Sequence, residues 1–209
     1  LGYTLAGTDV RGHRDGEVTV AQFRNCRGVA VEGDGNVFVA DTGNHRVRKI
    51  TRQGLVSSLA GTGIPGYLDG EVTVAQFKSP CGLAVDWDGN IVVADKFNHR
   101  IRMVTPQGHV STLAGTGEGG HRDGIGTFSQ FYAPNGVAVD GDGNIIVADC
   151  DNNCIRKITP RGCVSTLAGT DKHGYRDGEG TLAQFDGPTG LAVDGDGNII
   201  VADLSLIHI

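Results

Sequence analysis

The chain has 209 residues, of which 34 are glycine, one is tryptophan and one is methionine, and its formal net charge is −6. So much glycine disfavours long helices and is compatible with an all-β repeat fold. The acidic balance argues against a nucleic-acid binder, which usually has a basic surplus on one face, and no apolar run approaches the roughly 20 residues of a membrane-spanning helix.

One pattern occurs four times at a spacing of 54 residues. A fixed period of this length indicates a repeat protein. Residue types shared by all copies are expected to serve the common fold, whereas positions that differ are free for a function of one copy. Leu-Ala-Gly-Thr begins at Leu5, Leu59, Leu113 and Leu167, and the block G-[LV]-A-V-[DE] begins at Gly28, Gly82, Gly136 and Gly190.

Each copy predicts four short antiparallel strands, which we name a to d in chain order. In the third copy, residues 136–140 form an apolar run that ends at Gly-Asp-Gly-Asn, and residues 145–149 follow as the second strand. Residues 154–159 mix β-branched and basic side chains, as in a strand with one wet side, and residues 164–168 form the last strand. Four-stranded sheets at this spacing are typical of the blades of a β-propeller.

The long connection from strand d to the next strand a has its own pattern, Thr-x-x-Gln-Phe. The threonine hydroxyl can cap a helical turn while the glutamine reaches back, so one short helical turn is predicted in each connection. The phenylalanine is predicted to wedge between neighbouring blades. The positions are Thr19, Gln22 and Phe23; Thr73, Gln76 and Phe77; Thr127, Gln130 and Phe131; and Thr181, Gln184 and Phe185.

The string V-A-D-x-x-N-H-R-[IV]-R, at residues 39–48 and 93–102, is followed in the second copy by T-P-x-G and S-T-L-A-G. It resembles the NHL repeat in its longer form. The resemblance implies a β-propeller, usually of six blades closed into a ring, and most often a non-catalytic interaction module. The third copy reads Asn152-Asn153-Cys154 in place of Asn-His-Arg, so a role of the histidine is not expected in every blade.

One NHL-type propeller segment is predicted over residues 1–209. Complete blades are predicted at 28–60, 82–114 and 136–168, with a partial blade at 190–203 and an isolated strand d at 3–6. Since about four repeats are present, we interpret the chain as a fragment of a six-bladed ring that belongs to a longer, multidomain protein. Unpaired strand edges would make this fragment poorly stable or prone to association.

The five cysteines fall at five different positions of the repeat and predict no disulfide framework. Such a set is typical of ordinary thiols and points to a reducing, cytoplasmic compartment, although no segment fixes the localisation. The spacing of the last three lacks the paired ligands of a zinc site. The cysteines are Cys26, Cys81, Cys150, Cys154 and Cys163.

The turns between strands a and b carry paired acidic residues. Asp-x-Asp-Gly-Asn, as at residues 140–144, resembles the start of a calcium-binding loop but lacks the later glycine and glutamate of such a loop. We interpret these segments as hairpin turns in which Asp and Asn satisfy the backbone. An acidic face near the inner strands is predicted, with a weak affinity for divalent cations as a subsidiary hypothesis. Its residues are Glu32, Asp34, Asp86, Asp88, Asp140, Asp142, Asp194 and Asp196.

The basic residues of strand c are predicted to lie farther from the channel than this acidic face. They are Arg46, Arg48, Lys49, Arg100, Arg102, Arg156 and Lys157.

No catalytic residue, metal ligand or cofactor is assigned. An aspartate closes strand b in every copy and a histidine follows in two, but an active site needs a unique constellation and these groups recur. The aspartate is expected to accept hydrogen bonds from loop amides or from the histidine of its own blade. The residues are Asp41, Asp95, Asp149 and Asp203, with His45 and His99.

The residues that differ between copies are predicted to share one face. In a propeller the b-to-c and d-to-a connections emerge opposite the a-to-b and c-to-d turns, and most of the variation falls in these connections. Arg, Tyr and Phe anchor many interfaces, so a partner-binding surface is predicted on this loop-rich face. Its candidate residues are Arg14, Arg24, Arg27, Tyr67, Lys78, Lys96, Phe97, Arg122, Tyr132, Tyr175 and Arg176.

We expect a non-catalytic scaffold module that binds a protein partner. Two alternatives stay open. A propeller lyase or hydrolase with a divalent metal in the channel would need unlike polar residues from several blades, whereas the channel strands offer Gly, Leu, Val and Ala before their acidic turns. Single-stranded RNA binding would use the Arg and aromatic residues of the same face.

Overall fold

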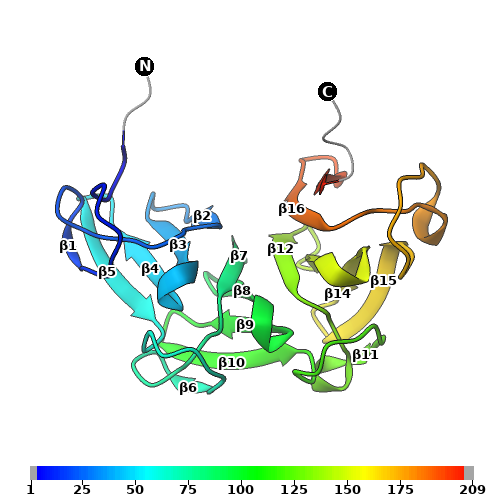
Figure 1. Ribbon diagram of the computed structural model, residues 1–209, viewed down its shortest axis with the longest axis horizontal. Helices are drawn as coiled ribbons and strands as arrows, with labels where there is room; N and C mark the ends of the chain where they lie inside the picture. The colour runs from blue at the N-terminus through cyan, green and yellow to red at the C-terminus, as the bar shows by residue number, and fades with distance from the viewer. Residues whose placement is uncertain (1–3, 205–209) are drawn as a thin grey trace.

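The computed structural model describes residues 4–204 as an arc of four β-sheets around a common centre (Figure 1). Three sheets have five strands and the fourth has two, and all strand pairs are antiparallel. The innermost strands of successive sheets contact one another, β2 with β7, β7 with β12 and β12 with β16. The predicted all-β propeller architecture is confirmed. None of the helical turns in residues 4–204 is long and apolar enough to cross a membrane.

We number the sheets as blades 1 to 4 and give their strands in the order a to d. Blade 1 holds β2 (Val29–Val31), β3 (Val37–Asp41), β4 (Arg46–Ile50) and β5 (Leu55–Ala60). Blade 2 holds β7 (Pro80–Val85), β8 (Ile91–Asp95), β9 (Arg100–Val104) and β10 (His109–Ala114). Blade 3 holds β12 (Pro134–Val139), β13 (Ile145–Asp149), β14 (Cys154–Ile158) and β15 (Cys163–Gly169). Blade 4 holds β16 (Pro188–Val193) and β17 (Ile199–Asp203).

A fifth, two-residue strand lines the outer edge of each five-stranded blade and is absent from the sequence prediction. β1 (Gly16–Glu17), β6 (Gly70–Glu71) and β11 (Gly124–Ile125) pair with the start of strand d, for example Gly16 with Val56. Each comes from the connection that precedes its blade. The connection thereby covers the outermost strand edge, which would otherwise present unpaired amide and carbonyl groups.

The helical turn predicted in these connections is a 3₁₀ turn in two copies, η3 (Gly126–Phe128) and η5 (Gly180–Leu182). In the first two copies it is a hydrogen-bonded turn, in which the amide of Ala75 donates to the carbonyl of Glu71 at 2.9 Å. The predicted threonine cap is wrong, since Thr127 lies inside the 3₁₀ turn and no side chain caps it. The glutamine that follows instead pairs through its main chain with the start of the connection, as Gln130 does with Arg122.

Residues 4–6, part of the strand predicted at 3–6, are not in a strand, and residue 3 lies outside the described residues. No strand in residues 4–204 lies alongside them to supply hydrogen-bond partners. Ala6 instead packs on the small core of blade 1 that includes Phe23.

The repeated phenylalanine packs between blades, as predicted. Phe77 and Phe131 are fully buried. Phe77 belongs to a core cluster that joins Phe38 and Val47 of blade 1 to Val93 of blade 2. Burying one phenylalanine stabilises the fold by about 1.5–3 kcal/mol, so each blade interface has a large apolar contribution.

One arginine in strand c of each complete blade is fully buried, whereas the sequence predicted only that these basic residues lie farther from the channel than the acidic turns. Arg102 has no exposed surface and its guanidinium lies 2.9 Å from Asp95 and 2.5 Å from Asp69. It also donates to the carbonyls of Gln76 and Leu68, and its Cζ lies 5.1 Å from the centre of the Phe77 ring. Both faces of an inner blade are covered by neighbouring blades, so a charge here requires partners. Arg48 and Arg156 make the equivalent contacts.

Candidate functional site

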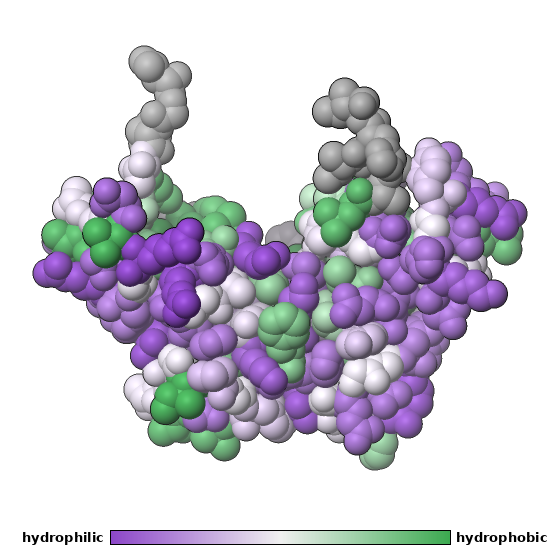
Figure 2. Space-filling model, viewed as in Figure 1, coloured by the Kyte–Doolittle hydropathy of each residue, from purple (hydrophilic) through white to green (hydrophobic). Residues whose placement is uncertain are grey.

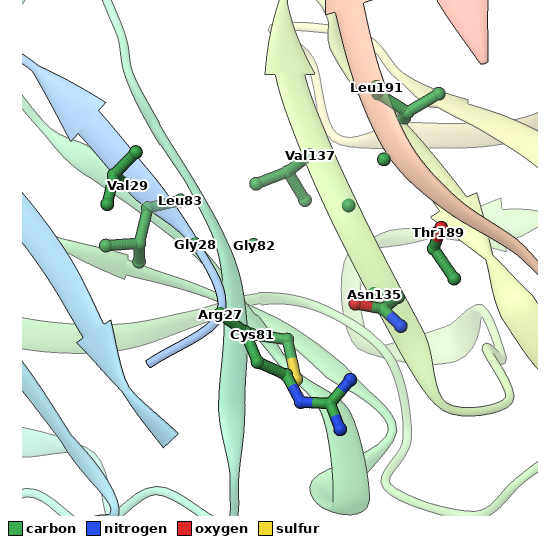
Figure 3. A pocket seen from close by; sticks show the side chains of 12 residues that line it. Arg27, Gly28, Val29, Cys81, Gly82, Leu83, Asn135, Val137, Thr189 and Leu191 are labelled. Atoms are coloured by element: carbon green, nitrogen blue, oxygen red, sulfur yellow. The ribbon is translucent and has the colours of Figure 1, made fainter. Parts of the chain in front are cut away.

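The mouth of the central channel is lined by the first residues of the four strands a. A cavity of about 160 Å³ opens there. Four unlike polar side chains line it, one from each blade, at equivalent positions of the repeat (Figure 3). The expectation that the channel strands offer only Gly, Leu, Val and Ala is therefore wrong at this end, because the residue just before the repeated glycine also lines the channel. The four residues are Arg27, Cys81, Asn135 and Thr189.

The b-to-c connections stand beside this mouth and are 3₁₀ turns, which we call the b–c loops: η1 (Thr42–Asn44), η2 (Lys96–Asn98) and η4 (Cys150–Asn152). We call the face that carries them the loop face. Main-chain hydrogen bonds fix each b–c loop to the residue that leads into strand a of its blade. The amides of Gly43, Phe97 and Asp151 donate to the carbonyls of Arg24, Lys78 and Tyr132, at 2.8, 3.1 and 3.1 Å.

The aspartate that ends strand b organises this region. In blade 2, Asp95 accepts hydrogen bonds from the amide of Lys78 at 2.7 Å, from Asn98 and from Arg102. Burial raises the pKa of Asp95 to about 6, against the opposing effect of the Asn98 and Arg102 contacts. The predicted structural role as an acceptor from loop amides is confirmed. The predicted bond to the histidine of the same blade is wrong, because that ring faces the next blade.

The histidine after each b–c loop links two blades. Nδ1 of His45 accepts from the amide of Ser79, and Nδ1 of His99 accepts from the amide of Ala133, both at 3.0 Å. In the third copy Asn153 replaces the histidine, and its Oδ1 accepts from the amide of Gly187 at the same distance. All three linking residues have a left-handed backbone, with φ between 52° and 54°. The departure of the third copy from the Asn-His-Arg string therefore preserves the contact.

The substitution His99→Asn should make the fold less sensitive to acid. Burial lowers the pKa of His99, assisted by Lys78 and Arg100 and opposed by Asp151. A lowered pKa stabilises the fold above the unfolded value of about 6.5, and this contribution is lost as the pH falls through that value toward the folded pKa. The drop in melting temperature from pH 7.5 to pH 5 should therefore be smaller in His99→Asn than in the parent protein. The reverse change, Asn153→His, should increase the fall; equal slopes in all three proteins would contradict the assignment.

The structure separates the eleven candidate residues into two groups. Six lie around the channel mouth and the b–c loops: Arg24, Arg27, Lys78, Lys96, Phe97 and Tyr132. The other five, Arg14, Tyr67, Arg122, Tyr175 and Arg176, belong to the segments that run along the outer edges of the blades. Tyr67, for example, hydrogen-bonds Thr112 of strand d at 3.0 Å, and the Cζ of Arg100 lies 3.7 Å from the centre of its ring.

Charge changes sign across the loop face. On its blade 1 and 2 side, the charged residues at the variable positions are all cations: Arg24, Arg27, Lys78 and Lys96. On its blade 3 and 4 side, the charged residues are Asp151 and Asp186. The space-filling view shows apolar residues as small separate spots among hydrophilic ones (Figure 2). Such a surface favours recognition by a few side chains over association through one broad apolar patch.

The opposite face carries the a-to-b turns, and these are the predicted hairpins. Oδ1 of Asp140 accepts from the amides of Asp142 and Asn144, at 3.0 and 2.8 Å, and Gly143 has a φ of 78°. Within residues 4–204, no group of three or more His, Cys, Asp or Glu side chains is placed to hold a metal ion.

Trp87 also lies on this turn face, and sequence reasoning overlooked it. It is 79% exposed and borders a cavity of about 580 Å³ with the turns of blades 3 and 4. Comparison of the four copies of the repeat could have identified Trp87, because the other three copies have glycine at this position: Gly33, Gly141 and Gly195.

Burial keeps the thiols near the channel protonated. It raises the pKa of Cys81, against the opposing effect of Lys96 and Arg27, and it raises the pKa of Cys26 to about 11. The Cys81 thiol donates to the carbonyl of Ser79 at 3.4 Å. A raised pKa makes a thiol a poorer nucleophile at neutral pH.

Comparison with known proteins links the chain to one family. A family model described as the NHL repeat matches residues 23–50, 77–102 and 131–158. The chain is 30% identical over 217 residues to the protein SUPPRESSOR OF QUENCHING 1, chloroplastic, of Arabidopsis thaliana, covering 96% of this chain and 21% of that protein. It is 36% identical over 149 residues to NHL repeat-containing protein 2 of Homo sapiens, covering 68% and 19%. The chain spans about a fifth of the length of these relatives.

Two solved structures share the fold. An auxiliary nutrient binding protein from Bacteroides ovatus superposes with a TM-score of 0.68 at 20% identity, covering 88% of this chain and 47% of that one. A gluconolactonase from Xanthomonas campestris superposes with a TM-score of 0.63 at 18% identity, covering 88% and 56%. Each family-model match begins at the inter-blade phenylalanine and includes strands a and b and most or all of strand c of one blade. The chain belongs to the NHL-repeat β-propeller family.

Proposed function

We propose that this chain is an interaction module that binds a protein partner through the loop face. The observation that carries the proposal is the contrast between framework and surface. The hydrogen bonds that hold the b–c loops are the same in blades 1 to 3, while the central residue of the loop differs in every blade, as Gly43, Phe97 or Asp151. A rigid framework that presents different side chains is the usual arrangement of a recognition surface.

Two exposed aromatic side chains supply candidate anchors. Phe97 on η2 is 50% exposed, and Tyr132 at the start of blade 3 is 44% exposed. Tyr132 is held in place by an edge contact with His99, with ring centres 5.4 Å apart. Aromatic side chains with a fixed orientation lose little entropy on binding, and they are frequent among the residues that dominate binding energy.

The test is a selection of peptide or protein binders from a displayed library against the full chain, followed by affinity measurements on two variants. Phe97→Asp introduces the residue of the third copy, Asp151, and should weaken the selected binders about tenfold or more. Trp87→Gly introduces the residue of the other three copies on the opposite face and should leave affinity unchanged. Binders that depend on Trp87 and not on Phe97 would overturn the proposal.

A lyase or hydrolase is the second candidate function, because four unlike polar side chains converge at the channel mouth. The resemblance in fold to a gluconolactonase adds support at the level of architecture only. A guanidinium, a thiol, an amide and a hydroxyl are a poor donor set for a hard divalent cation. Turnover of a lactone or ester that is lost in Asn135→Ala, with binding of the selected partners unchanged, would favour this second function.

A further inference from the structure

A second cavity on the loop face lies between blades 1 and 2. It has a volume of about 240 Å³, and its walls include Thr42, Ser79, Cys81, Arg27, Lys96 and Phe97. We call it the junction pocket. At about 30 Å³ per water molecule it has room for about eight waters, which suits one side chain of a partner and its hydration.

The walls of the junction pocket are fixed by contacts between the two blades. The hydroxyl of Thr42 in blade 1 donates to the carbonyl of Pro80 in blade 2 at 2.6 Å. The amide of Ser79 donates to His45 of blade 1. A ligand that enters the pocket therefore meets walls that are already ordered, and this lowers the entropic cost of binding.

Two cations border the pocket without a carboxylate to neutralise them. Arg27 is exposed and Lys96 is half-buried. No Asp or Glu side chain within residues 4–204 lies within 4.0 Å of either charged group. The buried arginines of the same blades, in contrast, each bind two carboxylates. A concave site with two unpaired cations has a field that attracts an anion.

The pocket also has an apolar side. Half of the Phe97 side chain is exposed, and the Lys96 ammonium lies 5.7 Å from the centre of its ring. A carboxylate that binds the cations would place its neighbouring residue over this ring. The site therefore favours an acidic residue flanked by an apolar one.

The junction between blades 2 and 3 lacks this combination. The positions of Arg27, Lys96 and Phe97 are taken there by Cys81, Cys150 and Asp151. The negative charge of Asp151 would repel an anion, so the junction between blades 2 and 3 does not offer the same anion site.

Resting on the proposed function, we propose that the junction pocket binds the carboxylate of an Asp or Glu side chain of the partner protein, with Arg27 and Lys96 as its cationic ligands and Phe97 in contact with the flanking apolar residue. RNA suits this surface less well. A nucleic acid strand needs a continuous basic path for successive phosphates, whereas the loop face turns acidic at Asp151 and Asp186.

The experiment compares three fluorescent probes on the full chain by anisotropy at low and moderate salt. They are a short peptide with a central Leu-Glu-Leu, the same peptide with Leu-Gln-Leu, and a single-stranded poly(U) oligonucleotide. The Glu peptide should bind about tenfold more tightly than the Gln peptide, as expected for a charge-assisted contact. Equal binding of the two peptides, or no detectable binding of the Glu peptide, overturns the proposal. Tighter binding of poly(U) replaces it with nucleic-acid recognition.

The chain supplies its own control residues. The double variant Arg27→Thr and Lys96→Thr uses the residues that other copies have at these positions, Thr189 and Thr42. It should abolish the preference for Glu over Gln with an unchanged melting temperature, while Trp87→Gly should retain the preference. A preference that survives the double variant overturns the pocket assignment. If library binders still depend on Phe97, the proposed function stands without the pocket; if they do not, both fail.

Discussion

Replacing Arg102 by methionine is expected to lower the free energy of unfolding by about 3–5 kcal/mol, the usual cost of leaving a buried charge without its partner. Arg102 is fully buried between Asp95 and Asp69, and Asp95 has no exposed surface. Methionine has a similar length but cannot donate to either carboxylate or to the carbonyls of Gln76 and Leu68. Urea unfolding followed by tryptophan or tyrosine fluorescence measures the loss.

The pH dependence of this loss tests its cause. Burial already raises the pKa of Asp95 to about 6, and removal of the guanidinium should raise it further. When the pKa of a carboxyl is higher in the folded than in the unfolded state, it lowers the free energy of unfolding at high pH. This loss of stability becomes smaller as the pH falls and the carboxyl is protonated in both states. The gap between variant and parent should therefore narrow from pH 8 to pH 5. Arg161→Ala, at an exposed position of a c-to-d turn, should cost no more than about 0.5 kcal/mol at either pH. If the difference in the free energy of unfolding between variant and parent did not change with pH, the loss of stability would come from packing alone.

The strands and their order could be predicted from the sequence because each has a clear local signal. Apolar runs such as residues 145–149 are bounded by Gly, Asp, Asn and Pro, and the 54-residue period fixes which runs correspond. The edge strands escaped prediction since two residues such as Gly16 and Glu17 are too few to show alternation. They form because strand d offers them a free edge, and that is a property of the assembled blade.

The burial of Arg48, Arg102 and Arg156 was not predicted, because the pattern of strand c was taken only to place its basic residues farther from the channel than the acidic turns. The spacing of acidic residues in the repeat does indicate that these arginines are buried. An aspartate recurs 33 residues before each of these arginines, at Asp15, Asp69 and Asp123, and another ends strand b seven residues before. Acid and base that recur together in every complete blade are typical of a shared internal ion pair, since a copy-specific function would not need them in each blade.

The candidate site was predictable in part. Comparison of the copies identified the variable residues, but it could not tell which of them reach the channel mouth and which follow the outer edge of a blade. That division depends on the path of the d-to-a connection, which runs past strand d before it enters strand a. The junction pocket could not be predicted from the sequence, because Arg27 and Lys96 are 69 residues apart and line one pocket only when blade 2 packs on blade 1.

The substitution Gly82→Ala is expected to cost about 3 kcal/mol, at the upper end of the usual range for overpacking. Strands a of neighbouring blades approach closely at the repeated glycine, as at Gly28, Gly82 and Gly136. A Cβ on Gly82 would overlap the carbonyl oxygen of Asn135 and lie 2.8 Å from the amide nitrogen of Val137. Both are main-chain atoms, so no side chain can rotate away, and blades 2 and 3 would have to move apart. Thermal or urea unfolding of the variant measures the cost.

Gly190→Ala is the matched control within the same chain. The nearest atom to a Cβ there is the Cβ of Ala202, at an ordinary 3.4 Å, within the same blade. Alanine also restricts the unfolded chain more than glycine does, which favours folding by about 0.4–1 kcal/mol where the backbone permits it. The control should therefore be neutral or slightly stabilising, and Gly136→Ala, whose Cβ would overlap the carbonyl of Thr189, should be as costly as Gly82→Ala. Equal effects at Gly82 and Gly190 would mean that the glycine serves the conformation of its own strand, and the close approach of neighbouring inner strands would no longer explain why it recurs.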